Sequence, residues 1–361
     1  MTTPDASAPA WDADAFRAEV GAALEAFVDE QAVRLEPLGD DAARLVEAAR
    51  GSLAGGKRFR AAFCAWGFRA VRDEGDAGPA LVRASAALEV LHASALVHDD
   101  FMDASDTRRG RPATHKAFEA LHRERGWAGD PRQYGAAAAI LLGDLLLSWS
   151  DELLRRCGLP DDVVGDALGC FDVTRSEVIT GQFLDVSVQA RGASDVEQAM
   201  RVLRYKSAKY SIERPLHVGA ALAGGDAELH AALTAFGLPL GEAFQLRDDL
   251  LGVYGDPAAT GKPAGDDLTE GKRTVLVALA LDGAAPDDAK RLDAALGRDL
   301  SEEEVADLRR IIDASGAHAE VERRIDVLTA EALAALDRAP VTEPARAVLR
   351  ELAAAATQRA L

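Results

Sequence analysis

The chain has 361 residues and a formal net charge of −19, with 48% apolar and 5% aromatic residues. Binding of a nucleic-acid backbone needs basic surface, so we expect no nucleic-acid partner for so acidic a protein. Ala and Leu are abundant and runs of β-branched residues are few. This balance favours helices over sheets, and we expect an all-α fold.

Apolar residues recur at helical spacing along almost the whole chain. The helices that this spacing predicts cover, in order, residues 14–35, 39–53, 79–103, 113–124, 134–157, 160–190, 195–224, 226–253, 273–282, 301–315, 317–337 and 342–359. Residues 79–103 are apolar almost all round, which is typical of a helix buried inside a bundle. The predicted loops are 126–132 and 255–271. No Pro-, Gly- or Ser-rich linker divides the middle, so we expect a flexible tail over 1–14 and one domain over 15–361.

The chain lacks the signals of export and of membrane insertion. Its first 14 residues are polar and acidic, without the basic region and apolar core of a signal peptide. No window reaches the roughly 18 uninterrupted apolar residues of a transmembrane segment. Cys64, Cys157 and Cys170 lie in apolar stretches without metal-type spacing, as reduced core thiols do. We therefore expect a cytoplasmic protein without a transmembrane segment.

Two carboxylate clusters are the most informative feature of the chain. The first contains Asp99, Asp100 and Asp103, and the second contains Asp248 and Asp249. Residues three or four apart share a helix face, so the carboxylates of the first cluster lie side by side. Like charges this close repel, and such clusters are tolerated mainly where cations such as Mg²⁺ bind together with substrate phosphates. The two clusters predict a diphosphate substrate held between them.

Basic residues gather in four runs, at 55–60, 108–111, 205–210 and 261–274. In the first run, paired glycines let the backbone approach a ligand closely, and three cations at the start of a helix would suit a phosphate. A solvated patch of charge is the ordinary explanation of any single run. Four such runs, interleaved with two acidic clusters, are typical of a site for metal ions and more than one phosphate.

The ordered set of motifs resembles the trans-prenyltransferases, the polyprenyl (isoprenyl) diphosphate synthases, from about residue 15 to about residue 355. The matching motifs are Gly-Gly-Lys-Arg-x-Arg at 55–60, Asp-Asp-x-x-Asp at 99–103, Arg-Arg-Gly at 108–110, Gly-Gln-Phe-Leu-Asp at 181–185, Lys-Ser at 206–207, Phe-Gln-x-x-Asp-Asp at 244–249, Gly-Lys at 261–262 and Lys-Arg at 272–273. The resemblance implies an isoprenoid synthase fold, a single large helical bundle around a deep central cavity, usually as a homodimer.

The resemblance also implies metal ligands. Three Mg²⁺ ions are expected: Asp99 and Asp103 would bind two of them and Asp248 the third, with Asp100 and Asp249 acting indirectly or through water. Many relatives have a third aspartate in the second motif where this chain has Gly252, which leaves the coordination of the third ion open.

Substrate contacts follow from the same resemblance. The residues matching those that hold the diphosphate of isopentenyl diphosphate are Lys57, Arg60, His92 and Arg109. Those matching the clamp on the allylic diphosphate are Arg108, Lys206 and Lys262, while Ser207, Gln182 and Gln245 would line the reacting carbons. A hydrogen-bonded core histidine is the alternative interpretation of His92.

The implied reaction extends dimethylallyl, geranyl or farnesyl diphosphate by one isopentenyl unit. Cleavage of the allylic C–O bond releases pyrophosphate once Mg²⁺ and fixed cations neutralise its charge. The double bond of isopentenyl diphosphate then attacks the carbocation, and the departing pyrophosphate takes up the proton that is lost. Asp99, Asp103, Arg108, Lys206, Gln245, Asp248 and Lys262 would act in catalysis. A class I terpene cyclase would lack the second basic site, and a non-catalytic synthase subunit would have lost one acidic cluster.

Product length depends on the helix below Asp99, whose pitch of about 5.4 Å is close to one isoprene unit. Relatives that stop at fifteen carbons commonly carry Phe or Tyr four or five positions before the first aspartate, where this chain has Ala95 and Ser94. Leu91 and Leu88 are candidates for the floor of the tunnel. We therefore expect geranylgeranyl diphosphate, with a longer polyprenyl diphosphate as the alternative and farnesyl diphosphate as a weaker one.

Overall fold

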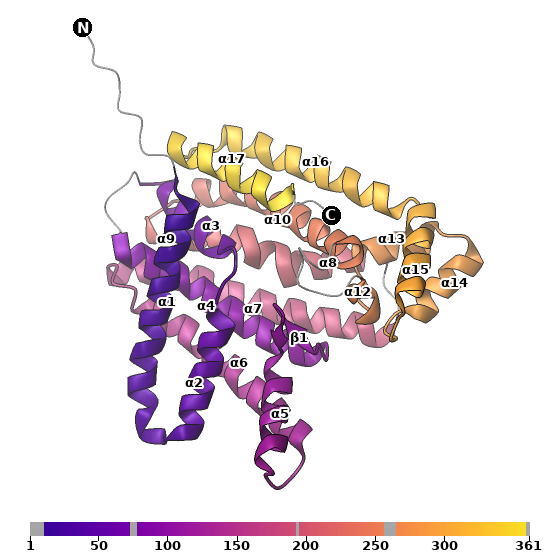
Figure 1. Cartoon of the computed structure of the whole chain (residues 1–361). Coiled ribbons are helices and arrows are strands. Elements are labelled where there is room, and N and C mark those ends of the chain that lie inside the picture. Colours follow the sequence, from indigo (N-terminus) through magenta and orange to yellow (C-terminus); the bar gives the residue numbers. More distant parts are fainter. Residues whose placement is uncertain (1–10, 73–77, 193–194, 256–264, 359–361) are drawn as a thin grey trace.

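The computed structural model describes residues 11–72, 78–192, 195–255 and 265–358, and these residues are almost entirely helical (Figure 1). The helices are α1 (Ala13–Leu35), η1 (Glu36–Leu38), α2 (Asp40–Leu53), α3 (Phe59–Arg69), α4 (Gly78–Met102), α5 (Thr114–Arg125), α6 (Pro131–Arg155), α7 (Asp161–Arg191), α8 (Val196–Leu203), η2 (Arg204–Glu213), α9 (Arg214–Leu222), α10 (Ala227–Tyr254), α12 (Asp266–Thr269), α13 (Val275–Gly283), α14 (Pro286–Ala295), α15 (Glu302–Ala314), α16 (Ala317–Arg338) and α17 (Glu343–Thr357). The predicted all-α fold is confirmed.

Side-chain caps start several of these helices where the sequence offers a short acceptor. Asp130 accepts a hydrogen bond from the backbone N–H of Arg132 at 2.9 Å, and Pro131 takes the first helical position of α6. Asp226 accepts from the backbone N–H of Leu229 at 2.9 Å at the start of α10. Each cap satisfies a backbone donor that the helix itself cannot.

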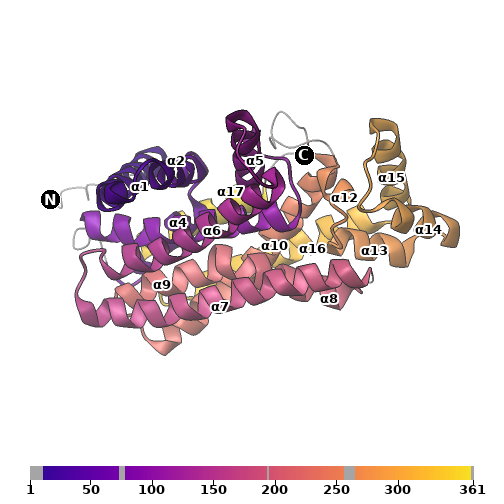
Figure 2. The ribbon, with the colours of Figure 1, turned by 90° about the horizontal axis from the view of Figure 1, so that it is seen from below.

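The helices pack in layers, with α4 inside the bundle (Figure 2). Helix α4 packs against α6, α3 and α1, and Leu88, Val90 and Leu91 are all at most 2% exposed. It is long and apolar enough to cross a membrane by length and composition, but 67% of its most apolar window is buried in this fold. This helix therefore acts as the core element that its sequence pattern predicts.

Two apolar clusters form the core, and α10 joins them. Leu233, Phe236 and Leu240 of α10 pack in the cluster with α3, α4 and α9, whereas Leu246 and Leu250 pack with α13, α15 and α16. The second aspartate motif lies in the latter half of α10, which α16 covers along its length (Figure 1). The motif is therefore fixed by packing on both sides.

The structure differs from the sequence-based elements at four places. The predicted single helix over 195–224 is α8, a π-helical turn η2 and α9 in succession. Helix α14 lies between 283 and 300, where we expected no helix, and the short α12 lies inside the predicted loop over 255–271. One antiparallel pair, β1 (Thr107–Arg108) with β2 (Arg111–Pro112), interrupts the described helices directly after the first aspartate motif.

Candidate active site

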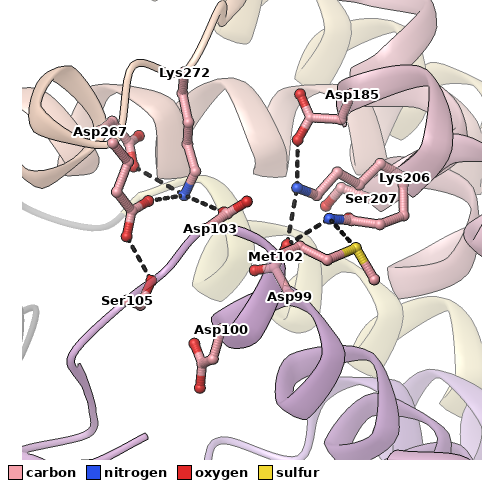
Figure 3. Close-up of polar contacts among 12 residues, drawn as sticks. Asp99, Asp100, Met102, Asp103, Ser105, Asp185, Lys206, Ser207, Asp267 and Lys272 are labelled. Atoms are coloured by element: carbon pink, nitrogen blue, oxygen red, sulfur yellow. Dashed lines mark hydrogen bonds and ion pairs between the residues drawn. The ribbon is translucent and has the colours of Figure 1, made fainter. Parts of the chain in front are cut away.

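The first aspartate motif lies at the end of α4, and Lys206 connects it to α7 (Figure 3). Lys206 Nζ lies 2.6 Å from Asp185 Oδ2 and 3.0 Å from Asp99 Oδ1. Gln182 Nε2 also donates to Asp99 Oδ1, at 3.0 Å. The structure thus brings together the predicted residues of the first motif, the 181–185 motif and the Lys-Ser motif.

A second lysine reaches the first motif from the segment that follows α10. Lys272 Nζ lies 2.5 Å from Glu270 Oε2, 3.4 Å from Asp267 Oδ1 and 3.6 Å from Asp103 Oδ2. Ser105 Oγ donates to Glu270 Oε1 at 2.8 Å, which ties the same segment to the end of α4. Two ammonium groups therefore balance the charge of this acidic site.

The pKa values of the carboxyl groups diverge because their surroundings differ. Burial opposes ionisation of Asp99, but Lys206, Lys272 and Arg108 outweigh it and hold the pKa well below its usual range. Burial and the neighbouring charge of Asp99 raise the pKa of Asp103 to about 6. Adjacent acids with pKa values pushed apart are characteristic of functional sites.

Gln245 joins the second motif to the π-helical turn η2. Ser207 Oγ donates to Gln245 Oε1, and Gln245 Nε2 donates to Asp249 Oδ1 at 2.8 Å. Burial, with the charges of Asp267 and Asp248 adding to it, raises the pKa of Asp249 to about 8 although the hydrogen bond from Gln245 opposes the shift. Predicted residues from η2 and α10 are therefore in direct contact.

Close backbone packing holds η2 in place. A Cβ on Gly181 of α7 would lie 2.4 Å from the backbone nitrogen of Lys206. A Cβ on Gly241 of α10 would lie 2.4 Å from the carbonyl oxygen of Ala208. Any side chain at either glycine would push η2 away, so both glycines are needed to place Lys206 and Ser207. Local π-helical turns are frequent at functional sites.

Arg60 and His92 meet at Tyr210, which also belongs to η2. The guanidinium of Arg60 lies 4.2 Å from the centre of the Tyr210 ring and donates to Ser211 Oγ at 2.8 Å. His92 Nδ1 and Tyr210 Oη are 2.7 Å apart in a hydrogen bond. Burial and nearby arginines, Arg60 first among them, lower the pKa of His92 well below its ordinary value. His92 is thus a half-buried, neutral, hydrogen-bonded histidine at the edge of a cationic cluster.

The β1–β2 pair directs the side chains of two adjacent arginines to different partners. Arg109 and Gly110 form its two-residue turn with φ of 52° and 71°, the left-handed conformation that such hairpins need. Arg108 Nε donates to Asp100 Oδ1 at 2.7 Å and its Nη2 lies 3.6 Å from Asp99 Oδ2. Arg109 Nη1 instead donates to the carbonyl oxygen of Ala54, at the end of α2. The turn directs one cation to each of the two predicted diphosphate positions.

Arg58 of the first basic run contacts the ends of α2 and α3. Arg58 is only 9% exposed, and its Nη2 donates to the carbonyl oxygen of Leu53 at 2.6 Å. Its Nη1 lies 3.4 Å from Glu89 Oε2, whose Oε1 accepts from the backbone N–H of Ala61 at 3.2 Å. Arg58 therefore fixes the start of α3, whereas Lys57 is exposed.

The predicted chain-length residues face different ways. Ser94 is 3% exposed and its Oγ donates to the carbonyl oxygen of Gly143 on α6, at 2.7 Å. Ala95 lies one helical turn before Asp99 and therefore on the same face of α4. Leu91 and Leu88 are 2% and 1% exposed in the core below. Ala95 is thus the residue directly beneath the first motif.

The donor set fits a Mg²⁺ ion whose ligands come partly from the protein and partly from the substrate. Among the described residues, no three His, Cys, Asp or Glu side chains are gathered into a ready chelate. Asp103 Oδ2 is buried and accepts no hydrogen bond from the described part of the chain. Mg²⁺ commonly takes one or two carboxylates and completes its shell with substrate phosphates and water. Carboxylates of both motifs could bind it in this way, and it would neutralise the charge of a departing diphosphate.

The structure also shows which expectations it leaves open and which residues we missed. Lys262 lies outside the described residues. One surface hollow lies beside α5 and another lies between α1 and α6, and the deep central cavity stays a prediction. Lys272 and Asp185 stand inside motifs of the resemblance, and Tyr210 ends the basic run at 205–210, but none of the three had been given a role.

Comparisons with known proteins agree with this geometry. A sequence profile described as polyprenyl synthetase matches residues 42–314. The chain belongs to the polyprenyl synthetase family. It is 35% identical over 265 residues to a short chain isoprenyl diphosphate synthase from Methanothermobacter thermautotrophicus, covering 73% of this chain and 74% of that one. It is therefore a prenyltransferase, an isoprenyl diphosphate synthase, and the implied reaction class is confirmed.

Two further similarities bear on the product and the metal. The structure resembles the geranylgeranyl pyrophosphate synthase of Corynebacterium glutamicum, complexed with isoprenyl diphosphate and magnesium, with 43% identity, a TM-score of 0.94 and coverage of 97% of this chain and 100% of that chain. The chain is also 34% identical over 249 residues to a (2E,6E)-farnesyl diphosphate synthase of Mycobacterium tuberculosis, covering 66% of this chain and 63% of the relative. The isoprenoid synthase fold is confirmed, whereas the relatives differ in product.

Proposed function

We propose that this isoprenyl diphosphate synthase extends dimethylallyl, geranyl and farnesyl diphosphates with isopentenyl diphosphate and releases geranylgeranyl diphosphate as its main product. The small side chain of Ala95, one turn beneath Asp99, is the observation that carries the product assignment. A growing chain passes a methyl group there and meets the buried Leu91 about one turn further down. A longer polyprenyl diphosphate is the second candidate.

The allylic diphosphate binds, in this proposal, between the two aspartate motifs. Lys206 and Arg108 already contact Asp99 and Asp100 there, so both cations are aimed at the place where the leaving group gathers charge. Lys262, which lies outside the described residues, would complete the clamp. Fixed cations in a buried site stabilise such a transition state without reorganising.

Isopentenyl diphosphate binds at the second cationic cluster. Arg60, the neutral His92 and Arg109 surround its diphosphate, together with the exposed Lys57. A class I terpene cyclase needs no such second anion site, and this cluster is the reason to prefer chain elongation. Helix η2 connects this cationic cluster to the first aspartate motif, because its Tyr210 contacts His92 and its Lys206 contacts Asp99.

The reacting carbons lie between these two anions, near the hydroxyl and amide groups of Ser207, Gln182 and Gln245. Their oxygen dipoles can face a developing carbocation without acting as nucleophiles, because Ser207 and Gln245 are held by their mutual hydrogen bond. Positioning and charge stabilisation supply the catalysis in this scheme.

Three Mg²⁺ ions complete the proposal. Asp99 and Asp103, one turn apart on α4, would share two of them, and Asp248 would bind the third. Asp100 accepts a hydrogen bond from Arg108, and Asp249 accepts one from Gln245, so both carboxylates suit indirect contacts with the Mg²⁺ ions. The magnesium in the Corynebacterium glutamicum structure supports the choice of metal, and the number of ions is our inference.

Incubation with radiolabelled isopentenyl diphosphate, Mg²⁺ and each allylic starter in turn tests the proposal. Chromatography of the dephosphorylated products should show geranylgeraniol as the main alcohol from all three starters. Farnesol as the dominant product, with farnesyl diphosphate refused as a starter, would rule out the product assignment. No incorporation from any starter would rule out catalytic elongation itself.

We further propose that the protein is a homodimer that pairs through α6 and α7. Ile179 and Phe183 of α7 are 55% and 68% exposed on one helix face, and Leu141 of the adjacent α6 is 60% exposed. Apolar groups gathered on one surface mark interaction sites. Analytical ultracentrifugation should show a dimer that Phe183→Glu dissociates. Val327→Glu on α16, at a residue 51% exposed, is the matched control and should leave the dimer intact.

A further inference from the structure

The two acidic motifs of this chain differ in their last position. The first reads Asp-Asp-x-x-Asp and ends at Asp103, whereas the second reads Asp-Asp-x-x-Gly and ends at Gly252. A Cβ built on Gly252 would lie 2.0 Å from Asp267 Oδ2 and 2.4 Å from its Cγ. The carboxylate of Asp267 therefore occupies the space into which a side chain at position 252 would point.

Asp267 is held in that space by a short helix with firm anchors. Its neighbour Leu268 in α12 is fully buried against α10. The carbonyl oxygen of Leu268 accepts from the backbone N–H of Gly297 at 3.0 Å, and that of Asp267 accepts from the N–H of Lys272 at 2.9 Å. These contacts fix α12 against the bundle, so the approach of Asp267 to Gly252 is built into the fold.

The Asp267 side chain also faces the first motif. Its Oδ1 lies 3.4 Å from Lys272 Nζ, which lies 3.6 Å from the buried Oδ2 of Asp103 (Figure 3). Asp103 Oδ2 accepts no hydrogen bond from the described residues. Asp267 thus lies against the second motif at Gly252 and is linked through Lys272 to the first motif.

We propose that Asp267 supplies the carboxylate that the second motif lacks at position 252, and that it binds the Mg²⁺ ion of that motif together with Asp248. Glycine at 252 is then required because it leaves room for an acid delivered from α12. This inference rests on the proposed binding of Mg²⁺ by the second motif. It adds a ligand from outside both aspartate motifs.

Metal binding without turnover tests the assignment. Electron paramagnetic resonance with Mn²⁺, in the presence of inorganic pyrophosphate, counts bound ions and their affinity. Asp267→Asn, which preserves size and packing, should lower the affinity for one Mn²⁺ ion by about tenfold or more. Even groups that only support a metal ligand contribute about 10- to 100-fold to metal affinity. Asp287→Ala, at an exposed acid on α14, should bind as the unmodified protein does.

Relocating the acid gives the sharper test. In Gly252→Asp/Asp267→Ala the carboxylate returns to α10 and the clash at 2.0 Å is removed, so the weakened Mn²⁺ ion should be recovered. Gly252→Asn/Asp267→Ala is the matched control with the same shape and no charge, and it should not recover the ion. Far-UV circular dichroism establishes that each variant is folded.

The outcomes separate this inference from the function on which it rests. If Asp248→Ala leaves every Mn²⁺ ion in place, the proposed metal site of the second motif is wrong. If Asp248→Ala loses an ion but Asp267→Asn binds Mn²⁺ normally, only the role of Asp267 is overturned. Equal Mn²⁺ affinity in the Asp and Asn double variants would show that Asp267 is merely a partner of Lys272, and would also overturn it.

Discussion

Lys206 Nζ lies 3.0 Å from Asp99 Oδ1, so a cation from η2 contacts the first carboxylate of the first aspartate motif. Burial opposes the charge of Lys206, yet Asp99 and Asp185 outweigh burial and raise the pKa of the ammonium group above its ordinary value. The group therefore stays charged at every physiological pH. A permanently charged lysine between α4 and α7 suits the neutralisation of a leaving diphosphate.

The metal assignment predicts a large loss of turnover when a motif carboxylate is removed. Asp99→Ala, Asp103→Ala and Asp248→Ala should each lower kcat by about 100-fold or more, because each removes stabilisation of charge that develops in the transition state. Initial rates over a range of Mg²⁺ concentrations measure the effect. The control Asp287→Ala, which removes an exposed acid, should keep the normal rate. A near-normal rate for Asp248→Ala at saturating Mg²⁺ would refute the third metal ion.

The two diphosphate positions should separate in steady-state kinetics. Arg60→Ala should chiefly raise the KM for isopentenyl diphosphate, because its guanidinium lies with His92 and Tyr210 in the cluster away from the leaving group. Lys206→Ala should act on the allylic substrate and on kcat, where leaving-group charge is greatest. Varying each substrate in turn at saturating levels of the other distinguishes the effects. The opposite pattern would reverse the assignment of the two sites.

Much of this site could be predicted because its residues stand in ordered motifs. The helix over 79–103 was also readily predicted, since a helix that is apolar all round must be buried, and α4 spans Gly78–Met102. The π-helical turn η2 could not be predicted, because its geometry depends on the close approach of Gly181 and Gly241. Side-chain periodicity carries no record of such a contact between distant elements.

The role of Lys272 depends on tertiary structure in the same way. The resemblance assigned the clamp to Lys262, which stands in the predicted loop over 255–271, and gave no role to Lys272, which follows that loop. The short α12 within that stretch turns the chain so that Lys272 returns toward Asp103, at 3.6 Å. A helix of four residues leaves too short a pattern to detect.

The free energy of unfolding should decrease in acid because of His217, which lies on α9 directly after η2. Burial, with the charges of Arg214 and His230 adding to it, lowers the pKa of His217 to about 3. In the unfolded chain the imidazole takes up a proton below about pH 6.5. Between pH 6.5 and 3, unfolding therefore binds a proton and the free energy of unfolding decreases as the pH falls. The slope from this one group approaches about 1.4 kcal/mol per pH unit.

Replacing His217 with Gln tests this slope, since Gln can still form hydrogen bonds with Arg214 or Thr234 but does not titrate. Denaturant unfolding of both proteins at pH 7, 6 and 5, at one protein concentration, gives the difference in free energy at each pH. The raised pKa of Asp103 acts with the opposite sign but is common to both proteins, so it cancels. Parallel pH curves for the two proteins would contradict the prediction.

Product length should respond to Ala95 more than to Ser94. Ala95 lies on the face of Asp99, so Ala95→Phe should place a ring beneath the motif and shift the product toward fifteen carbons. Ser94 faces α6 and donates to the carbonyl oxygen of Gly143, so Ser94→Phe should reduce stability as well as change the product. Chromatography of the dephosphorylated alcohols, together with thermal melts, separates the two effects.

The floor of the tunnel gives the complementary prediction. Leu91 is 2% exposed about one turn below Ala95, so Leu91→Ala should extend the product beyond twenty carbons by opening the space beneath. The same change should lower the free energy of unfolding by about 2–5 kcal/mol, because a buried leucine is removed from the core. Leu146→Ala, at a fully buried residue of α6, is the control for that loss of stability alone. If both leucine variants destabilise the protein and neither lengthens the product, then Leu91 is a core residue and the tunnel ends elsewhere.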